Sequence, residues 1–265
     1  MNTRTLCAIT TLIEITKKRG KTSMKLDPKQ LYEYFESIGI KYLYHANTVP
    51  TACTFIRAGG ILSRGAVEEQ GLYQTPQSSD EVDQEFNVWN DIFLDCNDLH
   101  KRFGRENRYG PVLFKYSIEL LLDHNLPEVW ITKDNPIRWN SEQKVEERYF
   151  INIDELKDSY SDKSYIEMIT LRFTKSPLSF KYLKEIILDN PKVRIGELIL
   201  YKDAAKILKE SLDSSDFDYT GLKRTTRNCI ACYCHSNYLR QYTPAKLKII
   251  FRGNDGYPED GSNRA

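Results

Sequence analysis

The stretch KYLYHANTVPTACTFIRAGGILSR, residues 41–64, decides the fold of this chain. Large apolar and aromatic residues alternate over residues 41–47, which predicts a half-buried strand. A helix is expected to begin within residues 48–51 and to end at the paired glycines of residues 59–60. The chain then leaves the helix as a short strand or turn.

His45 and Asn47 lie two residues apart on the expected strand, so their side chains point the same way. An imidazole and an amide would then present hydrogen-bonding groups side by side. A histidine that is satisfied within the core is the commoner case. The helix and the GGILSR turn that follow favour a functional role for this pair.

The segments on either side of this stretch predict a mixed α+β chain. Asp27 suits the N-cap of a helix that starts at Pro28 and ends at Gly39. The apolar runs expected as strands are residues 90–95, 110–118, 129–132, 164–173, 193–200 and 247–251. The remaining segments are expected as helices over residues 177–190 and 201–212, and as a long polar loop over residues 65–90. Neither a regular βαβ repeat nor a glycine-rich phosphate loop is visible in the sequence.

Residues 24–252 are expected to form a single domain, preceded by an N-terminal extension, residues 1–23, and followed by a disordered tail, residues 253–265. No window approaches the roughly 20 apolar residues of a membrane span. The charges of residues 17–19 follow the first apolar run, whereas a secretory signal places its charges first. We therefore expect a cytoplasmic protein that keeps its cysteines reduced and has no membrane partner.

The composition is that of an ordinary globular protein and excludes one class of function. Of the 265 residues, 40% are hydrophobic and 28% are charged. The 38 Lys and Arg residues and 37 Asp and Glu residues leave a net charge of +1, which excludes a histone-like polycation. A local basic groove is still allowed, since the total says nothing about how charges cluster.

Two groups of side chains could in principle bind a metal. Cys229, Cys232, Cys234 and His235 form the first, but tetrahedral zinc sites usually combine ligand pairs from separate segments. Buried thiols in a core strand are therefore favoured over a metal or redox site.

The second group is Asp91, Asp95, Asp98 and His100. On a strand Asp91 and Asp95 share one face, while the other two fall in the following loop. An acidic strand edge or a wall that faces a ligand is favoured here, so no metal ligand is predicted. A metal-dependent nuclease stays as an alternative.

Glu197 is an acidic residue inside an otherwise apolar run, residues 193–200. An ionised carboxylate is costly to bury. Either it faces water on an edge strand, or it points into a cleft where its charge has a use.

Residues 45–64 and 196–200 resemble two motifs of the DarT-type ADP-ribosyltransferases, toxins that modify nucleic-acid bases. In that family a first strand with a His-x-Thr-type NAD element precedes a helix, a glycine and a leucine-rich turn. A late strand carries a small residue, the catalytic glutamate and then apolar residues, as in GELIL here. The resemblance covers residues 42–200 and implies an α+β, ADP-ribosyltransferase-like fold with split mixed β-sheets around an NAD cleft.

The same resemblance implies roles for individual residues. Glu197 would be the catalytic carboxylate, which hydrogen-bonds the ribose 2′-hydroxyl and stabilises the positive charge that develops as nicotinamide leaves. The residues implied to hold NAD, the co-substrate, are His45, Asn47, Thr51, Ser63, Arg64 and Phe93. The aromatic candidates for stacking on nicotinamide are Phe93, Tyr109 and Tyr73.

The chain departs from the family before its middle strand, where the family carries a functional arginine. That region reads SSDEVDQE, residues 78–85, and no arginine lies between Arg64 and Arg102. We interpret the chain as a divergent relative, nearer the messenger-RNA-modifying, CmdT-like transferases of phage-defence toxin–antitoxin–chaperone systems. A neutralising antitoxin or chaperone is the partner that this resemblance implies.

Two segments interleave basic and aromatic residues, a pattern that suits single-stranded nucleic acid because cations meet phosphates and rings stack on bases. The residues expected to contact RNA or single-stranded DNA are Lys101, Arg102, Arg105, Arg108, Arg224 and Arg227. The predicted function is NAD-dependent transfer of ADP-ribose to a nucleic-acid base. A protein-directed transferase, an NAD glycohydrolase and a non-enzymatic nucleic-acid-binding module stay as alternatives.

Overall fold

A computed structural model describes residues 24–160 and 167–253. The predicted N-terminal extension, residues 1–23, lies outside the described residues, and so does the predicted tail apart from Gly253. None of the described helices is long and apolar enough to cross a lipid bilayer.

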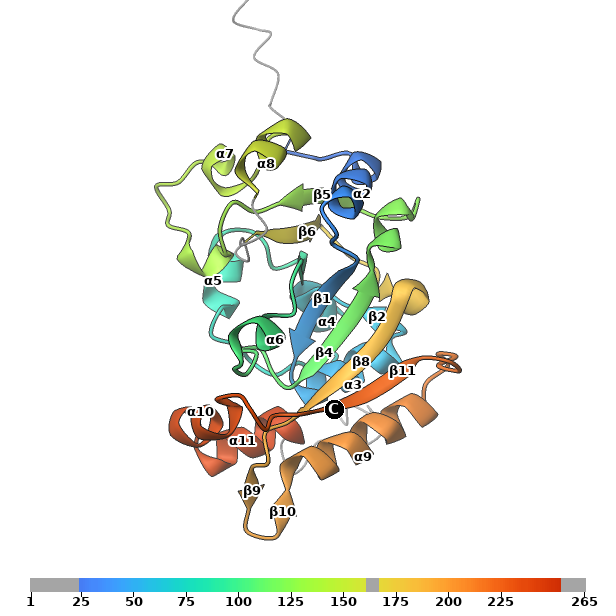
Figure 1. Ribbon diagram of the computed structural model, residues 1–265, viewed down its shortest axis with the longest axis vertical. Helices are drawn as coiled ribbons and strands as arrows, with labels where there is room; N and C mark the ends of the chain where they lie inside the picture. Colours follow the sequence, from blue (N-terminus) through green and yellow to red (C-terminus); the bar gives the residue numbers. More distant parts are fainter. Residues whose placement is uncertain (1–23, 161–166, 254–265) are drawn as a thin grey trace, which may run out of the picture.

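A seven-stranded mixed sheet runs through the protein (Figure 1). In spatial order its strands are β11 (Lys223–Asn228), β8 (Leu183–Asn190), β4 (Val112–Ser117), β1 (Tyr42–Asn47), β3 (Ile92–Asp95), β6 (Met168–Arg172) and β5 (Glu128–Ile131). Neighbouring strands are antiparallel, except that β11 runs parallel to β8. Two short ladders accompany the sheet: β2 (Gly60–Ile61) with β7 (Leu178–Ser179), and β9 (Arg194–Ile195) with β10 (Leu198–Ile199).

Helices surround the sheet, and their N-caps explain where several of them begin. They are α2 (Pro28–Ser37), α3 (Val49–Arg57), α4 (Arg64–Glu69), α5 (Asp80–Glu85), α6 (Leu99–Phe103), α7 (Val145–Arg148), α8 (Ile153–Ser159), α9 (Leu200–Asp213), α10 (Cys234–Gln241) and α11 (Pro244–Phe251), with 3-10 turns η1 (Ile118–Leu122), η2 (Pro136–Arg138) and η3 (Phe180–Tyr182). Asp27 caps α2, because its carboxylate accepts the Lys29 amide at 2.9 Å. Thr48 caps α3, so the predicted starts of both helices are confirmed.

The sheet divides between its central strand, β1, and the neighbouring strand β3. β1 pairs with β4 from Tyr42, opposite Ser117, to Asn47, opposite Val112. Its register with β3 is the single pair of Tyr44 opposite Asp95. Beyond that pair the two half-sheets diverge, which confirms the prediction of an α+β fold with split mixed sheets.

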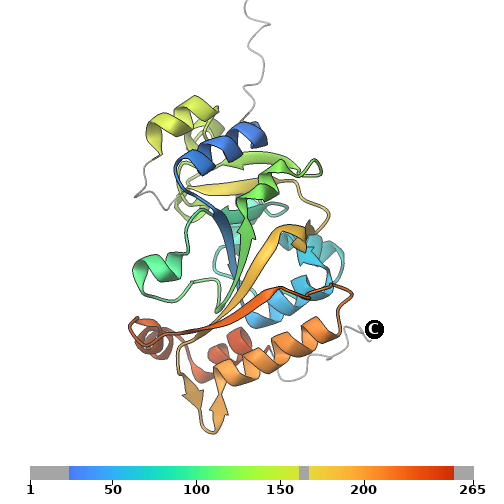
Figure 2. The same ribbon diagram turned by 45° about the vertical axis from the view of Figure 1, so that its right-hand side comes forward.

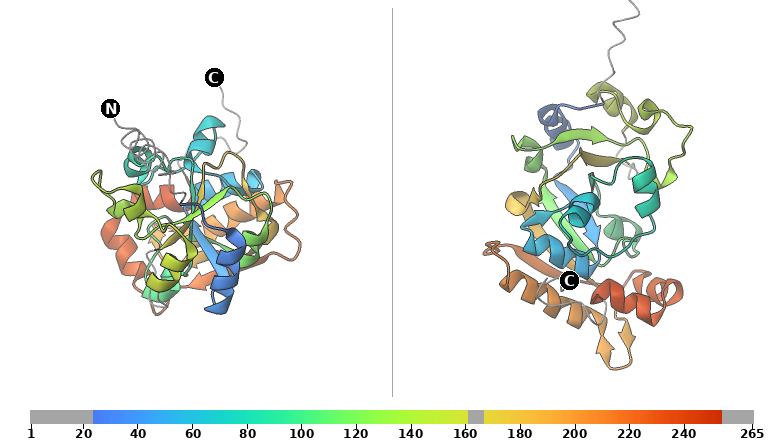
Figure 3. Two further views of the ribbon diagram at one scale, coloured as in Figure 1. Left: turned by 90° about the horizontal axis from the view of Figure 1, so that it is seen from above. Right: turned by 180° about the vertical axis from the view of Figure 1, so that it is seen from behind.

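Helices α3, α9 and α11 pack against one another behind the sheet (Figure 3, right panel). β8 and β11 run above α9, as Figure 2 shows. Phe114 of β4 is fully buried in this layer, 6.1 Å from Phe55 of α3 between ring centroids and stacked on Phe180 at 5.7 Å. The core therefore fixes α3, and with it the end of β1, against the sheet.

Residues 177–190, predicted as a helix, instead form β7, η3 and β8. β8 lies between β4 and β11, and residues 185–190 are all buried. Glu185 and Asp189 gave the run a helical spacing of polar residues, yet both are buried in the strand because they have partners: Lys115 and Lys223 pair with Glu185, and His100 pairs with Asp189.

Two predicted strands are also wrong. Residues 193–200 form the β9–β10 hairpin, whose turn contains Gly196 at a left-handed φ of 59°. Residues 247–251 are the last turns of α11, which starts after the Thr243 N-cap at Pro244. Both runs are short, and their apolar character reflects burial rather than a period of two.

Residues 65–90, predicted as a loop, contain most of α4 and all of α5. Ser63 caps α4 by accepting the Ala66 amide at 3.2 Å. Asp80, Glu81 and Asp83 occupy the first turn of α5, where acidic side chains are favoured by the helix dipole. The polar composition of this segment reflects helix ends rather than an absence of helices.

Candidate functional site

A cavity opens where β1 and β3 diverge, and we call it the fork cavity. Of the residues predicted to hold NAD, His45, Asn47, Arg64 and Phe93 line it. The segment between α4 and β3 forms a further wall through Gln74, Gln77, Ser79 and Asp83. The divergence of the sheet thus creates a site from segments that lie far apart in the sequence.

The imidazole of His45 is fixed across the fork. Its Nδ1 lies 2.9 Å from the carbonyl oxygen of Phe93, on the opposite strand. A carbonyl can only accept, so Nδ1 carries the proton and Nε2 is left as an acceptor. The Asn47 amide nitrogen lies 3.5 Å from Nε2. Burial lowers the pKa of His45, which keeps the ring neutral in this tautomer.

Asn47 connects β1 to the far wall of the fork cavity. Its side-chain oxygen accepts the Thr48 amide at 2.9 Å and the side-chain amide of Gln77 at 3.3 Å. Thr51, predicted to hold NAD, is buried and does not line the cavity. Its hydroxyl accepts the Thr75 amide at 2.9 Å, so it positions the segment that carries Gln77.

Arg64 reaches the fork cavity from the start of α4. Its Nη2 forms an ion pair with Asp80 at 2.6 Å, and its guanidinium lies 5.2 Å from the centre of the Trp89 ring. Ser63, also predicted to hold NAD, is buried and does not line the cavity. Its hydroxyl donates to the Thr174 carbonyl at 2.8 Å, which makes it a structural residue that orients Arg64.

Of the three aromatic residues predicted to stack on nicotinamide, two line the fork cavity. Phe93 and Tyr109 both line the fork cavity, whereas Tyr73 does not. Tyr109 also lines a neighbouring cavity, so it stands between the two.

Three carboxylic acids line the fork cavity: Asp83, Asp91 and Asp95. Burial raises the pKa of Asp83 and Asp91 to about 6 and that of Asp95 to about 7. Asp91 forms an ion pair with Arg172 at 3.2 Å and accepts the Phe173 amide at 2.9 Å. Asp91 and Asp95 therefore share a wall that faces a cavity, as their spacing indicated.

Glu167 is a further carboxylate, which sequence reasoning passed over. It directly precedes β6 and is buried. The next residue, Met168, lies opposite Asp95 and lines the fork cavity, whereas Glu167 itself does not. The signal was present in IEMITL, residues 166–171, where a glutamate precedes the apolar strand β6, which lies between β3 and the edge strand β5.

Glu197 lies elsewhere. It is exposed in the turn of the β9–β10 hairpin and does not line the fork cavity. The hairpin projects at the end of the protein far from β5 and β6 (Figures 1 and 3). The structure therefore does not bring Glu197 together with His45, contrary to the cleft-facing strand that the sequence suggested. The physical reason is Gly196, which allows a turn where a continuous strand was expected.

A second cavity adjoins the first, and we call it the basic cavity. Both cavities are lined by Ala46, Asp95 and Tyr109. The cationic side chains that line the basic cavity are Arg105, Arg108, Arg138 and Lys246, and Phe103 lies among them. Cations and a ring beside the fork cavity are what a single-stranded nucleic acid requires.

The six predicted nucleic-acid contacts do not form one surface. Arg105 and Arg108 line the basic cavity, whereas Lys101 and Arg102 line a separate depression beside α2. Arg224 lines a depression beside α9, with its guanidinium 5.2 Å from the centre of the Tyr219 ring. The six residues come from α6, the loop after it and β11, and among them only Arg105 and Arg108 line the basic cavity.

Arg227 is held by carboxylates rather than presented to solvent. Its guanidinium nitrogens lie 2.8 and 3.0 Å from the two carboxylate oxygens of Asp98, and its Nε lies 3.2 Å from Asp189. A guanidinium with both partners in place has a structural role here.

No family model matches this chain, and no curated protein matches it. Among solved structures, DarT of Thermus sp. 2.9 in complex with ADP-ribosylated single-stranded DNA aligns with 71% of this chain and 94% of its own, with 11% identity and a TM-score of 0.44. DarT of the same source in complex with NAD+ aligns with 71% of this chain and 96% of its own, with 10% identity and a TM-score of 0.40. Thermosipho africanus DarTG in complex with ADP-ribose aligns with 70% of this chain and 49% of its own, with 10% identity and a TM-score of 0.38. Values this low do not place the chain in a family.

Proposed function

We propose that this protein is an NAD-dependent ADP-ribosyltransferase whose active site is the fork cavity and whose acceptor is a base of single-stranded nucleic acid. The observation that carries the proposal is the neutral His45, fixed by the Phe93 carbonyl beside Asn47, at the point where the sheet divides. This is the strand for which the sequence resemblance implies NAD binding.

The lining suits the parts of NAD. An imidazole acceptor and an amide can hydrogen-bond a ribose hydroxyl and a carboxamide, since both offer polar atoms in fixed directions. Phe93 and Tyr109 supply aromatic faces for a planar ring. Arg64 adds a cation to the lining, of the kind that binds a diphosphate, although in this structure Asp80 pairs with it.

The acidic side chains suit the charge that the reaction creates. Nicotinamide is cationic in NAD+, and breaking its bond to ribose leaves positive charge on the sugar. A fixed carboxylate stabilises such charge, and one whose pKa lies near 7 can also accept a proton from the incoming nucleophile. Asp95 lines the cavity and has a pKa of about 7. Glu167, which is buried directly before β6, does not line the cavity and is the second candidate.

We assign the catalytic carboxylate to this β3–β6 ladder in place of Glu197. Removing the acting carboxylate should lower the transfer rate on the order of 10²–10³-fold. Asp95→Asn tests the ladder residue that lines the cavity, and Glu167→Gln tests the buried carboxylate directly before β6. Each substitution keeps the size of the side chain and removes its charge.

The acceptor follows from the basic cavity. Arg105 and Arg108 line the cavity that adjoins the fork cavity and supply cations for phosphates, and Phe103 in the same lining offers a ring for a base. DNA and RNA share this chemistry, so oligonucleotides of one sequence in both forms are the substrates to compare. An antitoxin or chaperone partner belongs to the same proposal as an expectation from the sequence resemblance.

The test uses labelled NAD with single-stranded DNA, RNA and a protein pool, and compares the wild type with His45→Ala, Asp95→Asn, Glu167→Gln and Glu197→Ala. We expect label on nucleic acid from the wild type and loss of label in His45→Ala. Either Asp95→Asn or Glu167→Gln should also lose the label, whereas Glu197→Ala should keep near wild-type activity. Loss in Glu197→Ala alone would return the catalytic role to that residue. Nicotinamide release without transfer, or label confined to protein, would refute the nucleic-acid acceptor.

A further inference from the structure

Four metal-binding side chains meet at a place away from the fork cavity. His100 comes from α6, Cys229 directly follows β11, and Cys232 and Cys234 lie at the start of α10. Their ligand atoms all lie within 4.8 Å of one another. Sequence reasoning grouped His235 with the cysteines, but the Nδ1 of His235 bonds the Pro191 carbonyl at 3.0 Å. The fourth group is His100, more than a hundred residues away in the chain.

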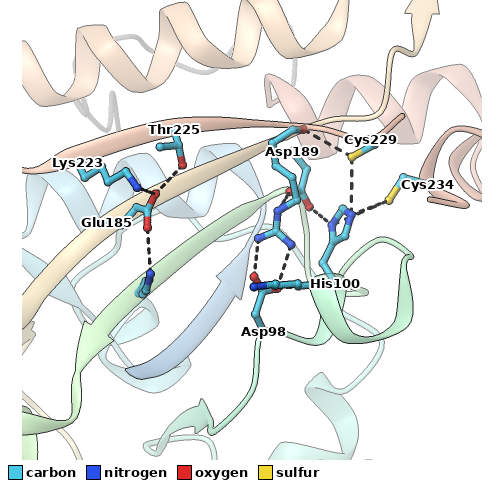
Figure 4. Close-up of polar contacts among 11 residues, drawn as sticks. Asp98, His100, Glu185, Asp189, Lys223, Thr225, Cys229 and Cys234 are labelled. Atoms are coloured by element: carbon cyan, nitrogen blue, oxygen red, sulfur yellow. Dashed lines mark hydrogen bonds and ion pairs between the residues drawn. The ribbon is translucent and has the colours of Figure 1, made fainter. Parts of the chain in front are cut away.

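The distances fit a tetrahedral site. The Nε2 of His100 lies 3.4 Å from the sulfur of Cys234 and 3.7 Å from the sulfur of Cys229 (Figure 4). Bonds of roughly 2.0 Å from zinc to nitrogen and about 2.3 Å to sulfur, at tetrahedral angles, place those atoms about 3.5 Å apart. One ion between the ligands would meet both separations.

The histidine is oriented for a metal by a carboxylate. Its Nδ1 lies 2.6 Å from Asp189 Oδ2, and Asp189 is completely buried. With the proton on Nδ1 donated to Asp189, Nε2 keeps its lone pair and points toward the sulfurs. A carboxylate behind a liganding histidine is a common arrangement at zinc sites, because it fixes both the tautomer and the ring. Arg227 in turn holds Asp189 through its Nε at 3.2 Å.

We propose that His100, Cys229, Cys232 and Cys234 bind a structural zinc ion. Three sulfurs and one imidazole are a soft, four-ligand set, which matches zinc and leaves no position open for substrate. His100, Cys229 and Cys234 are buried, as in a closed structural site. On binding, the three thiols lose their protons to solvent, and the thiolates neutralise the charge of the ion.

The zinc ion ties two distant segments together beside the basic cavity. α6 and the residues that follow it, through Tyr109, line the basic cavity. The loop that carries the cysteines is already joined to α6 by the Tyr233 amide, which donates to the Gly104 carbonyl at 2.7 Å. A metal at His100 therefore holds the wall that carries Arg105 and Arg108. The inference does not rest on the proposed function, because a metal can be measured without activity.

The first measurement is the zinc content of the purified, reduced full-length protein, by elemental analysis and by native mass spectrometry. We expect one zinc ion per chain that survives dialysis, and its loss in Cys234→Ser and in His100→Ala. Cys53→Ser and Cys96→Ser are matched controls, since both cysteines are buried elsewhere and should leave the zinc content unchanged. His235→Ala should also keep the ion.

Cobalt substitution uses the wild-type protein alone, so its result does not depend on whether a variant folds. We expect a sulfur-to-cobalt charge-transfer band and intense tetrahedral bands in the visible spectrum. A reduced wild-type protein that neither retains zinc nor takes up cobalt would overturn the proposal, as would a disulfide between these cysteines under reducing conditions. Zinc that persists at full stoichiometry in folded His100→Ala and Cys234→Ser variants would overturn it equally.

Discussion

Gly110 is a position at which the structure predicts that one added methyl group strongly lowers the free energy of unfolding. This residue precedes β4 and has a φ of 138°, a conformation that L-residues rarely adopt. A Cβ there would lie 2.4 Å from the backbone carbon and oxygen of Asn47 and from the nitrogen of Thr48. These atoms belong to the end of β1 and the cap of α3, so no side chain can turn aside to relieve the contact.

The magnitude follows from two terms. Holding a non-glycine residue in such a backbone conformation costs about 1–3 kcal/mol. Forcing the packed end of β1 away from the added carbon costs about 1–3 kcal/mol more. Gly110→Ala should therefore lower the free energy of unfolding by roughly 2–6 kcal/mol, since both terms act at one site. The corresponding fall in Tm is about 2–4 °C for each kcal/mol in a domain of this size.

Urea unfolding of the full-length protein, followed by circular dichroism and tryptophan fluorescence, measures the change. Two matched variants separate the terms. Gly39→Ala has a φ of 81° with no atom within 4 Å of the new Cβ, so it carries backbone strain alone, about 1–2 kcal/mol. Gly60→Ala would meet the Leu178 carbonyl oxygen at 2.4 Å without a left-handed φ, so it reports the steric cost alone.

A Gly110→Ala protein no less stable than Gly39→Ala would refute this reasoning, because the close approach to β1 would then carry no cost. The result does not depend on the proposed function. If the fork cavity does bind NAD, the displaced Asn47 should also weaken NAD binding in calorimetry, while Gly39→Ala should not.

Three further predictions concern charged side chains. The pKa of Asp95 is raised to about 7, so the folded state disfavours its charge and loses stability as pH rises between about 4 and 7. In urea unfolding, Asp95→Asn should therefore be more stable than the wild type at pH 8 but not at pH 4. An equal difference in stability at both pH values would contradict this prediction. Arg227→Ala removes the cation that pairs with Asp98 and Asp189 and should cost about 3–5 kcal/mol in urea unfolding, whereas Arg224→Ala on the same strand should stay within about 0.5 kcal/mol. The double variant Arg105→Ala with Arg108→Ala should bind single-stranded oligonucleotides more weakly than the wild type. The magnitude of the slope of log affinity against log salt should fall by about 0.7 for each phosphate that is no longer neutralised. Lys101→Ala is the control, and an unchanged slope in the double variant would argue against the basic cavity as the binding surface.

Local sequence signals predicted the first part of the fold well. Asp27 and Thr48 cap their helices because a side-chain oxygen next to a helix start satisfies free amides, whatever surrounds it. The alternation over residues 41–47 likewise gave β1, and the pairing of His45 with Asn47 on it. Such signals depend on neighbours in the chain and can be read without a structure.

Prediction of helices and strands from residue spacing failed where the spacing of polar and apolar residues did not follow the period of the element that forms. Residues 247–251 are mostly apolar because α11 is enclosed there, and a short apolar run is compatible with a strand or a helix. Residues 183–190 form a buried strand although Glu185 and Asp189 interrupt the apolar run. Glu197 was selected because it interrupts an apolar run, yet Gly196 bends that run into an exposed turn. Glu167 has the same local pattern but directly precedes β6, at the end of the β3–β6 ladder.

By itself the sequence determined the caps, the first strand and the identity of the groups that could do chemistry. The tertiary structure alone decided which of them meet. His45 of β1 reaches the Phe93 carbonyl of β3, and His100 of α6 reaches Cys229 and Cys234, although these residues are 48 to 134 positions apart in the chain. Register and sheet order set those encounters, and both depend on the packing of the whole core rather than on any short stretch of the chain.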